Sequence, residues 1–172
     1  MPAREPKPAN DGIGFLLSQL GHRAATLFAD LLTPLDMTPP LAGIVRLVAR
    51  QPGLSQQELA RQLNLLPSRV VSFVDDLETR GYLTRQRNDS DRRLYALHLT
   101  ANGEELMTKL SGVAREHDRR LAAGLNTEQR NQLRTLLAHV AEEQNLTPAV
   151  HPGYRGLRAN EPTSTPTRRR TS

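Results

Sequence analysis

Residues 55–100 read SQQELARQLNLLPSRVVSFVDDLETRGYLTRQRNDSDRRLYALHLT, and this stretch decides the fold. It opens with Ser55 and Glu58 in the S-x-x-E pattern of a capping box, in which hydroxyl and carboxylate satisfy backbone donors at a helix start. Apolar residues then follow at helical spacing, at Leu59, Ala60 and Leu63. The pattern therefore predicts a short helix with one buried face.

A second helix is predicted directly after a break at Asn64 and Leu65. Pro67 suits its first position, because the missing N–H would have had no partner there, and Gly81 can end it. The predicted inward face consists of Val70, Val71, Val74 and Leu77. Two helices joined by a tight turn predict a helix-turn-helix, a motif that lays its second helix in the major groove of DNA.

A basic hairpin is predicted after the second helix, with strands over residues 82–87 and 94–99. The second strand alternates with the period of a half-buried strand, and Asn-Asp-Ser-Asp at 88–91 has strong turn chemistry. Five arginines frame the hairpin: Arg80, Arg85, Arg87, Arg92 and Arg93. The fold class predicted from these elements is mainly α with a small β-hairpin, built around a winged helix-turn-helix lobe.

Further helices are predicted on both sides of this lobe. Apolar residues recur at helical spacing over residues 13–35 and 101–144, and Thr38 with Pro39 has the form of an N-cap and first-turn proline opening another helix. Asn126 and Gln129 repeat the capping-box pattern. The apolar stripes exceed what one small lobe needs, so we expect them to bury a second subunit.

The chain is thus divided into one domain and two tails. The domain covers residues 12–145, with its winged helix-turn-helix core at about 38–100 and dimerisation helices at about 13–35 and 101–144. Residues 1–11 are rich in proline and charge and are expected to form a disordered arm. Residues 146–172 are expected to form a flexible basic tail.

Composition excludes several classes of function. The chain has 172 residues, a formal net charge of +5 and no cysteine, which excludes disulfides, thiol nucleophiles and thiolate metal sites. It contains no Gly-rich phosphate loop, nucleophile elbow or catalytic carboxylate pair, so neither an enzyme nor a cofactor is predicted. The first residues, MPAREPKPANDG, lack the hydrophobic core of a secretory signal, and no apolar run approaches a membrane span, so we expect a cytoplasmic protein without membrane partners. The positive charge favours a polyanionic partner.

Three residues are predicted to contact DNA from the second helix of the motif. Ser68, Arg69 and Ser72 lie on its exposed side. Arg69 is predicted to read a base edge, with guanine as the expected base, and the serines to touch phosphate or bases. The alternative is that all three are ordinary solvated helix positions.

The hairpin supplies the remaining predicted DNA contacts. Arg92 or Arg93 is predicted to enter the minor groove, where the negative potential is enhanced, and Asp91 to pair with one of them and fix the loop. Arg85 and Arg87 on the first strand are predicted to contact phosphates. Alternatively, these residues form a solvated hairpin tip with weak ion pairs.

Histidines offer a weaker signal. None of the five makes an i, i+4 pair with another histidine, so no metal site is predicted. His22 and His117 belong to helices near the expected junction of lobe and dimerisation unit, where an imidazole can hydrogen-bond a ligand carboxylate. The alternative is a plain interface or surface histidine.

The ordered set of motifs resembles the MarR family of bacterial transcription regulators over residues 13–143. The matching segments are TPPLAGIVRLVA, LSQQELARQL, V-x-x-x-V-D-D-L-E-T-R-G-Y-L and DSDRRLYALHLTANG, whose Asp-Arg-Arg wing turn is the most diagnostic. The resemblance implies a triangular obligate dimer that binds double-stranded DNA, usually represses promoters and is often released by a small aromatic or phenolic ligand. One departure is that Ser72 and Asp76 stand where the family commonly has basic residues in the recognition helix. With Asp75 and Asp76 near its middle, this helix is expected to rely more on its N-terminal part and on the wing for contacts with phosphates.

The leading hypothesis is therefore a homodimeric repressor that binds a pseudo-palindromic operator and responds to a small-molecule effector. A non-specific DNA- or chromatin-binding protein without effector is one alternative. A winged helix used as a protein-interaction module is the other.

Overall fold

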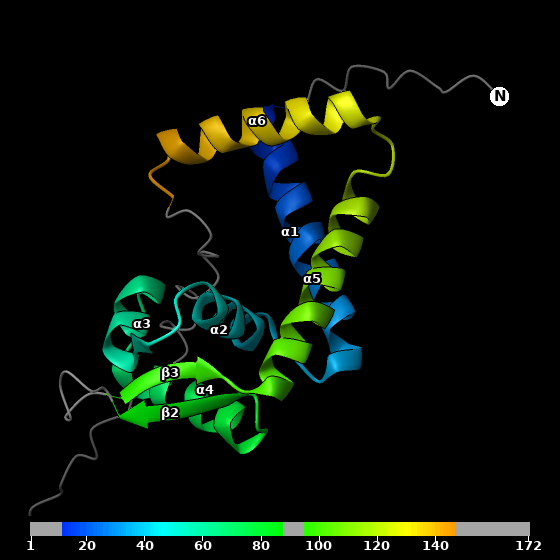
Figure 1. Cartoon of the computed structure of the whole chain (residues 1–172). Helices are drawn as coiled ribbons and strands as arrows, with labels where there is room; N and C mark the ends of the chain where they lie inside the picture. Colours follow the sequence, from blue (N-terminus) through cyan, green and yellow to red (C-terminus); the bar gives the residue numbers. More distant parts are fainter. Residues whose placement is uncertain (1–11, 88–94, 147–172) are drawn as a thin grey trace, which may run out of the picture.

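The computed structural model describes residues 12–87 and 95–146, which are mostly helical. Figure 1 shows a lower lobe made of α2, α3, α4 and the strands, and an open frame made of α1, α5 and α6. The elements are α1 (Ile13–Leu32), the 3₁₀ helix η1 (Thr33–Leu35), α2 (Pro39–Arg50), β1 (Leu54–Ser55), α3 (Gln56–Leu63), α4 (Pro67–Thr79), β2 (Leu83–Arg87), β3 (Tyr95–Leu99), α5 (Ala101–Leu121) and α6 (Thr127–Glu143). The predicted fold class is confirmed.

The sheet has one strand more than the predicted hairpin. Its order is β1-β3-β2, and both pairings are antiparallel. The hairpin pairs Leu83 with Leu99 and Arg87 with Tyr95, while the two-residue β1 pairs Leu54 with Leu97. A strand of two residues is too short to show a period, which is why the sequence did not predict it.

The core lies in the lobe and continues onto the start of α5. Its largest fully buried side chains are Leu32, Ile44, Val45, Val48, Leu59, Val70, Val74, Leu77, Leu83 and Leu97. The predicted inward position of Val71 is wrong, because this side chain is 43% exposed. At about 100° per residue, Val71 is rotated away from the face that Val70, Val74 and Leu77 share.

Helix starts follow the sequence patterns with one exception. The Ser55 hydroxyl accepts from the backbone N–H of Glu58, whose carboxylate accepts from the backbone N–H of Ser55 at 2.9 Å. Asn126 and Gln129 form the same reciprocal pair. Thr38 is the N-cap residue of α2 and proline occupies its first turn, as predicted, but the Thr38 side chain makes no capping hydrogen bond. Pro40, the second helical residue, lacks one of the N–H groups that such a cap would bond.

Helix ends position the motif. Asn64 ends α3 in the left-handed conformation (φ 53°), and Gly81, with φ 73°, follows α4. The N–H of Tyr82 donates to the carbonyl of Leu77 at 2.9 Å, which turns the chain sharply into β2. The helix predicted over residues 13–35 ends as an α-helix at Leu32 and continues as 3₁₀ helix from Thr33, one residue before Pro34.

The frame contrasts with the lobe. Helix α1 buries only Leu27 and Leu32, and α6 buries no residue at all. Every helix within residues 12–87 and 95–146 is too short or too polar to span a lipid bilayer.

Candidate nucleic-acid interface

Helix α4 presents a polar face to the outside of the lobe. Because Val70, Val74 and Leu77 fix its buried side, Ser68 and Ser72 lie on the exposed side, as predicted. The Ser72 hydroxyl donates to the backbone carbonyl of Ser68 at 3.2 Å, so its oxygen remains able to accept a hydrogen bond. Arg69 is half-buried at the edge of this face.

Arg85 is largely buried in the lobe, where protein acceptors hold its guanidinium. Its Nη1 donates to Glu78, its Nη2 to Asp75 and its Nε to the side-chain oxygen of Gln56 at 3.0 Å. Its backbone N–H also donates to Glu78, at 3.2 Å. The guanidinium that the sequence assigned to a phosphate contact thus joins the wing strand β2 to α4 and α3. These acceptors were not among the predicted site residues, because no local pattern links them to Arg85.

Arg80 pairs with two further acidic residues beside this cluster. Its Nε donates to Asp76 at 2.8 Å, and its Nη1 donates to the carboxylate of Asp36 at 3.0 Å. The hydrogen bond to Asp76 is the main cause that raises the pKa of Arg80 above its ordinary value. Each of the acidic side chains in the second half of α4 therefore has an arginine partner.

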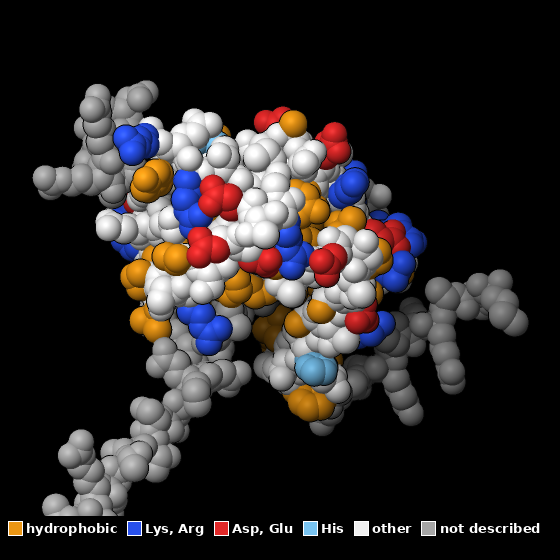
Figure 2. Space-filling model, turned by 90° about the horizontal axis from the view of Figure 1, so that it is seen from below, with side chains coloured by type: hydrophobic (Ala, Val, Ile, Leu, Met, Phe, Trp, Pro, Cys, Tyr) orange, Lys and Arg blue, Asp and Glu red, His pale blue; other side chains and the backbone are white. Residues whose placement is uncertain are grey.

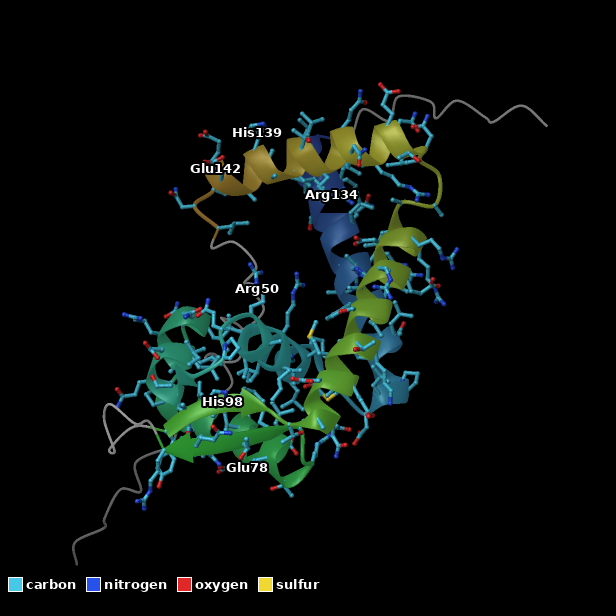
Figure 3. All side chains as sticks on the ribbon, in the orientation of Figure 1. Arg50, Glu78, His98, Arg134, His139 and Glu142 are labelled. Carbon is cyan, nitrogen blue, oxygen red and sulfur yellow. The ribbon has the colours of Figure 1, made fainter. Side chains whose placement is uncertain are left out.

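The lower face of the lobe is consequently mixed in charge. Figure 2 shows Lys and Arg interleaved with Asp and Glu over the described part of this face. Figure 3 shows Glu78 at the lower edge of the lobe, close to the ribbon of β2. The electrostatic field that a nucleic acid would meet depends on where the charged side chains lie and which of them are paired, more than on the number of basic residues.

The wing is only partly described. Arg87 is exposed at the end of β2, opposite Tyr95 of β3, and it makes no ion pair with any residue of the described ranges. The predicted contacts Asp91, Arg92 and Arg93 lie outside the described residues. Among the described residues of the wing, Arg87 is therefore the arginine whose charge is not engaged in an ion pair and can face DNA.

The two candidate ligand histidines have different surroundings. His117 Nε2 is 2.9 Å from the backbone carbonyl oxygen of Ala24, and its ring packs edge-on against Phe28 with 5.4 Å between centroids. His22 is exposed on α1. No hydrogen bond or ring contact joins the two histidines, and no group of residues within 12–87 and 95–146 is arranged to hold a metal ion.

A small hollow lies between lobe and frame. It has a volume of about 260 Å³ and is lined from α2, the turn that follows α2, β3 and α5 by Val48, Ala49, Pro52, His98, Leu99, Glu104 and Met107. Neither His22 nor His117 reaches it, and no sequence pattern distinguished its polar residues His98 and Glu104. Figure 3 shows His98 on the sheet of the lobe.

Known proteins share this arrangement. The MarR family profile matches residues 37–95. Over 156 residues the chain is 31% identical to the putative transcriptional regulatory protein for the hcr operon of Thauera aromatica, a match that covers 83% of this chain and 94% of that protein. The chain belongs to the MarR family.

Solved MarR-type structures extend the comparison. The transcriptional repressor CouR, bound to a 23-mer DNA duplex, is 31% identical, with a TM-score of 0.66 and coverage of 76% of this chain and 92% of CouR. Rv2887 of Mycobacterium tuberculosis in complex with DNA is 27% identical, with a TM-score of 0.66 and coverage of 76% and 98%. Rv2887 with salicylic acid is 28% identical, with a TM-score of 0.62 and coverage of 78% and 99%.

Membership fixes the general activity. As a MarR-family protein the chain is a DNA-binding transcriptional regulator and not an enzyme, because its relatives are regulators and repressors. The family profile covers most of the winged helix-turn-helix lobe, from α2 to the first residue of β3.

Proposed function

We propose that this protein is a homodimeric repressor that binds a pseudo-palindromic operator and releases it when a small aromatic ligand binds. The observation that carries the proposal is the pair of exposed apolar stripes on α1 and α6, at the end of the molecule opposite the lobe (Figure 1).

The two stripes have the same spacing. Phe15 of α1 is also exposed but lies outside the stripe; the stripe residues are Ile13, Leu16, Leu17 and Leu20 on α1, and Leu133, Leu136, Leu137 and Val140 on α6. In each helix they follow i, i+3, i+4, i+7, which places them on one face. Ile13 is 76% exposed and Leu136 is 63% exposed. Contiguous apolar surface of this kind marks a protein interface, and a second copy of the chain offers the self-complementary partner.

Two-fold symmetry then determines how DNA is read. A dimer presents two copies of α4, which fit half-sites about one helical turn, or roughly 10 base pairs, apart. The 23-mer bound by CouR is long enough for two such half-sites. Ser68, Arg69 and Ser72 contact the major groove, Arg87 contacts phosphate, and Arg92 or Arg93, oriented by Asp91, enters the minor groove.

Repression and release are supported by the relatives. CouR and Rv2887 are named as repressors, and Rv2887 has been crystallised with salicylic acid. A ligand at the junction of lobe and frame changes the separation of the two α4 helices, provided that it binds the two states with different affinity. The hollow beside His98 and Glu104 lies at this junction, and His22 offers an exposed imidazole on α1.

Selection of duplexes from random DNA tests the operator. The selected duplex should bind at least ~10³-fold more tightly than a mixed-sequence duplex of equal length. Arg69→Ala should weaken binding to the selected duplex by roughly 5- to 150-fold, the equivalent of ~1–3 kcal/mol for a lost bidentate base contact. Arg115→Ala, which removes the same charge from an exposed position on α5, is the matched control and should change affinity little. Equal affinity for all duplexes would make the protein a non-specific DNA binder.

Sedimentation tests the dimer. Leu136→Asp puts a charge into the α6 stripe and should shift the protein from dimer to monomer. Thr135→Asp adds the same charge one residue earlier on the opposite, polar face of α6 and should leave the dimer intact. A wild-type protein that sediments as a monomer, or dissociation by both variants, would refute the proposed interface.

A further inference from the structure

Helix α4 is more acidic than a DNA-reading helix is expected to be. It carries Asp75, Asp76 and Glu78 against the single cationic side chain of Arg69. DNA phosphates repel carboxylates, so an unpaired acidic group beside the groove opposes binding of any duplex. Asp75 is the residue of most concern, because its side chain is 57% exposed and lies one turn after Ser72 on the same side of the helix.

We propose that Arg85 is an internal counterion for this helix: it offsets part of the negative charge of Asp75 and Glu78 so that α4 can approach DNA, and it is not itself a phosphate contact. The inference rests on the proposed role of α4 as the recognition helix. It assigns Arg85 a positioning role, exerted through the two carboxylates and through the strand that carries it.

The geometry favours this role over a phosphate contact. The Arg85 side chain is only 18% exposed, while its two carboxylate partners are 57% and 38% exposed. All three of its side-chain nitrogens have protein acceptors, on Asp75, Glu78 and Gln56. Reaching a phosphate would require breaking these bonds and leaving two carboxylates uncompensated next to a polyanion.

Guanidinium is suited to this position and an ammonium is not. A planar fork can hold two carboxylates and an amide oxygen in fixed directions, whereas lysine offers a point charge on a flexible stem. The backbone N–H of Arg85 also bonds to Glu78, so the same residue fixes the register of β2 against α4. The angle between wing and recognition helix therefore depends on the same cluster of Arg85, Asp75, Glu78 and Gln56 that sets the charge.

Charge rescue separates the counterion from a contact. Binding of the selected duplex and of a mixed-sequence duplex is measured by fluorescence anisotropy over a range of salt concentrations. Arg85→Gln should weaken binding of both duplexes by about tenfold at low salt, because two carboxylates become unpaired. Adding Asp75→Asn to Arg85→Gln should recover most of this loss. Asp75→Asn alone should not weaken binding and should strengthen it slightly, because it removes a negative charge from the cluster while Arg85 still holds Glu78.

Two outcomes would overturn the inference. If Arg85 contacts phosphate, the double variant will stay as weak as Arg85→Gln and the salt slope will fall by about one contact. If Arg85 is only structural, the double variant will likewise not recover binding, and the affinity losses of the variants will follow their losses in Tm. Arg85→Lys provides a folded reference that keeps the charge if Arg85→Gln unfolds, and it should retain more affinity than Arg85→Gln or Arg85→Met.

Failure of the proposed function is a separate result. A wild-type protein that does not prefer the selected duplex would refute operator recognition. The rescue by Asp75→Asn can still be measured on the mixed-sequence duplex, and its absence there refutes the counterion alone.

Discussion

Gly103, near the start of α5, should not tolerate even one added methyl group. A Cβ at this position would lie 2.1 Å from the carbonyl oxygen of Tyr82 and 3.3 Å from Cβ of Leu99. Ordinary carbon–oxygen contacts are about 3.3 Å or longer, so α5 would have to move by roughly 1 Å. The obstacle is backbone, and it cannot be relieved by a side-chain rotation.

The surrounding hydrogen bonds prevent an easy movement. The backbone N–H of Thr100 donates to the carbonyl of Tyr82 at 3.1 Å, and the Thr100 hydroxyl donates to the carbonyl of Gly81 at 2.5 Å. Overpacking at such a site costs about 3 kcal/mol, and weakening these bonds costs about 1 more. The higher helix propensity of alanine offsets about 1 kcal/mol of this loss. The expected net loss for Gly103→Ala is therefore roughly 3 kcal/mol.

Gly112 provides a control in the same helix. Its added Cβ would meet only the Arg115 side chain, at 3.9 Å, so Gly112→Ala should raise the free energy of unfolding by about 0.5–1 kcal/mol. Both variants and the wild type are unfolded in urea and followed by circular dichroism at one protein concentration. Gly103→Ala as stable as the wild type, or an equal loss in Gly112→Ala, would refute the steric argument.

Two further predictions concern carboxylates at helix ends. Hydrogen bonds from Arg119 and Arg120 lower the pKa of Glu116 to about 2. Because this lies below the ordinary value of 4.5, the stabilisation is complete above that pH and is lost as the pH falls through about 2, so the difference in Tm between wild type and Glu116→Gln should shrink over this range; a constant difference would contradict it. Ser55→Ala should reduce the free energy of unfolding by about 1 kcal/mol. The hydrogen bonds from the backbone N–H of Ser55 and, second, from its hydroxyl lower the pKa of Glu58; alanine keeps the first and removes the second, so the pKa should rise only part of the way to its ordinary value, and an unchanged carboxyl titration by NMR would refute this.

Features that depend on neighbours within four residues could be predicted from the sequence. The boxes at Ser55 and Asn126, the proline at the start of α4 and the glycine after its end all formed as expected. Each involves groups that one helical turn brings together whatever the rest of the chain does. Thr38 also stands at the N-cap of α2 with proline in the first turn, as predicted, although its side chain makes no capping hydrogen bond.

Features that depend on distant partners could not be predicted. Strand β1 forms because Leu54 pairs with Leu97, more than forty positions later in the sequence. The packing of the helices brings these two segments together. Val71 illustrates a different difficulty, since an apolar residue next to an apolar stripe gives no sign of which side it joins. Its exposed position follows from which side of α4 packs against the rest of the lobe, which is a tertiary property.

The charges counted in the sequence and the charges left unpaired in the structure differ, and this difference affects the expected DNA binding most. The sequence counts Arg80, Arg85 and Arg87 alike as cations near a hairpin, and it counts Asp75 as an acid in an unsuitable place. Once folded, Arg85 and Asp75 are bonded to each other, Arg80 is bonded to Asp36 and Asp76, and Arg87 alone of the three arginines has no ion pair within the described ranges. A neutralised pair contributes little to the field a Debye length away, about 8–10 Å at ordinary salt. Attraction to DNA should therefore depend on far fewer charges than the composition suggests, and the salt slope of binding should be correspondingly small.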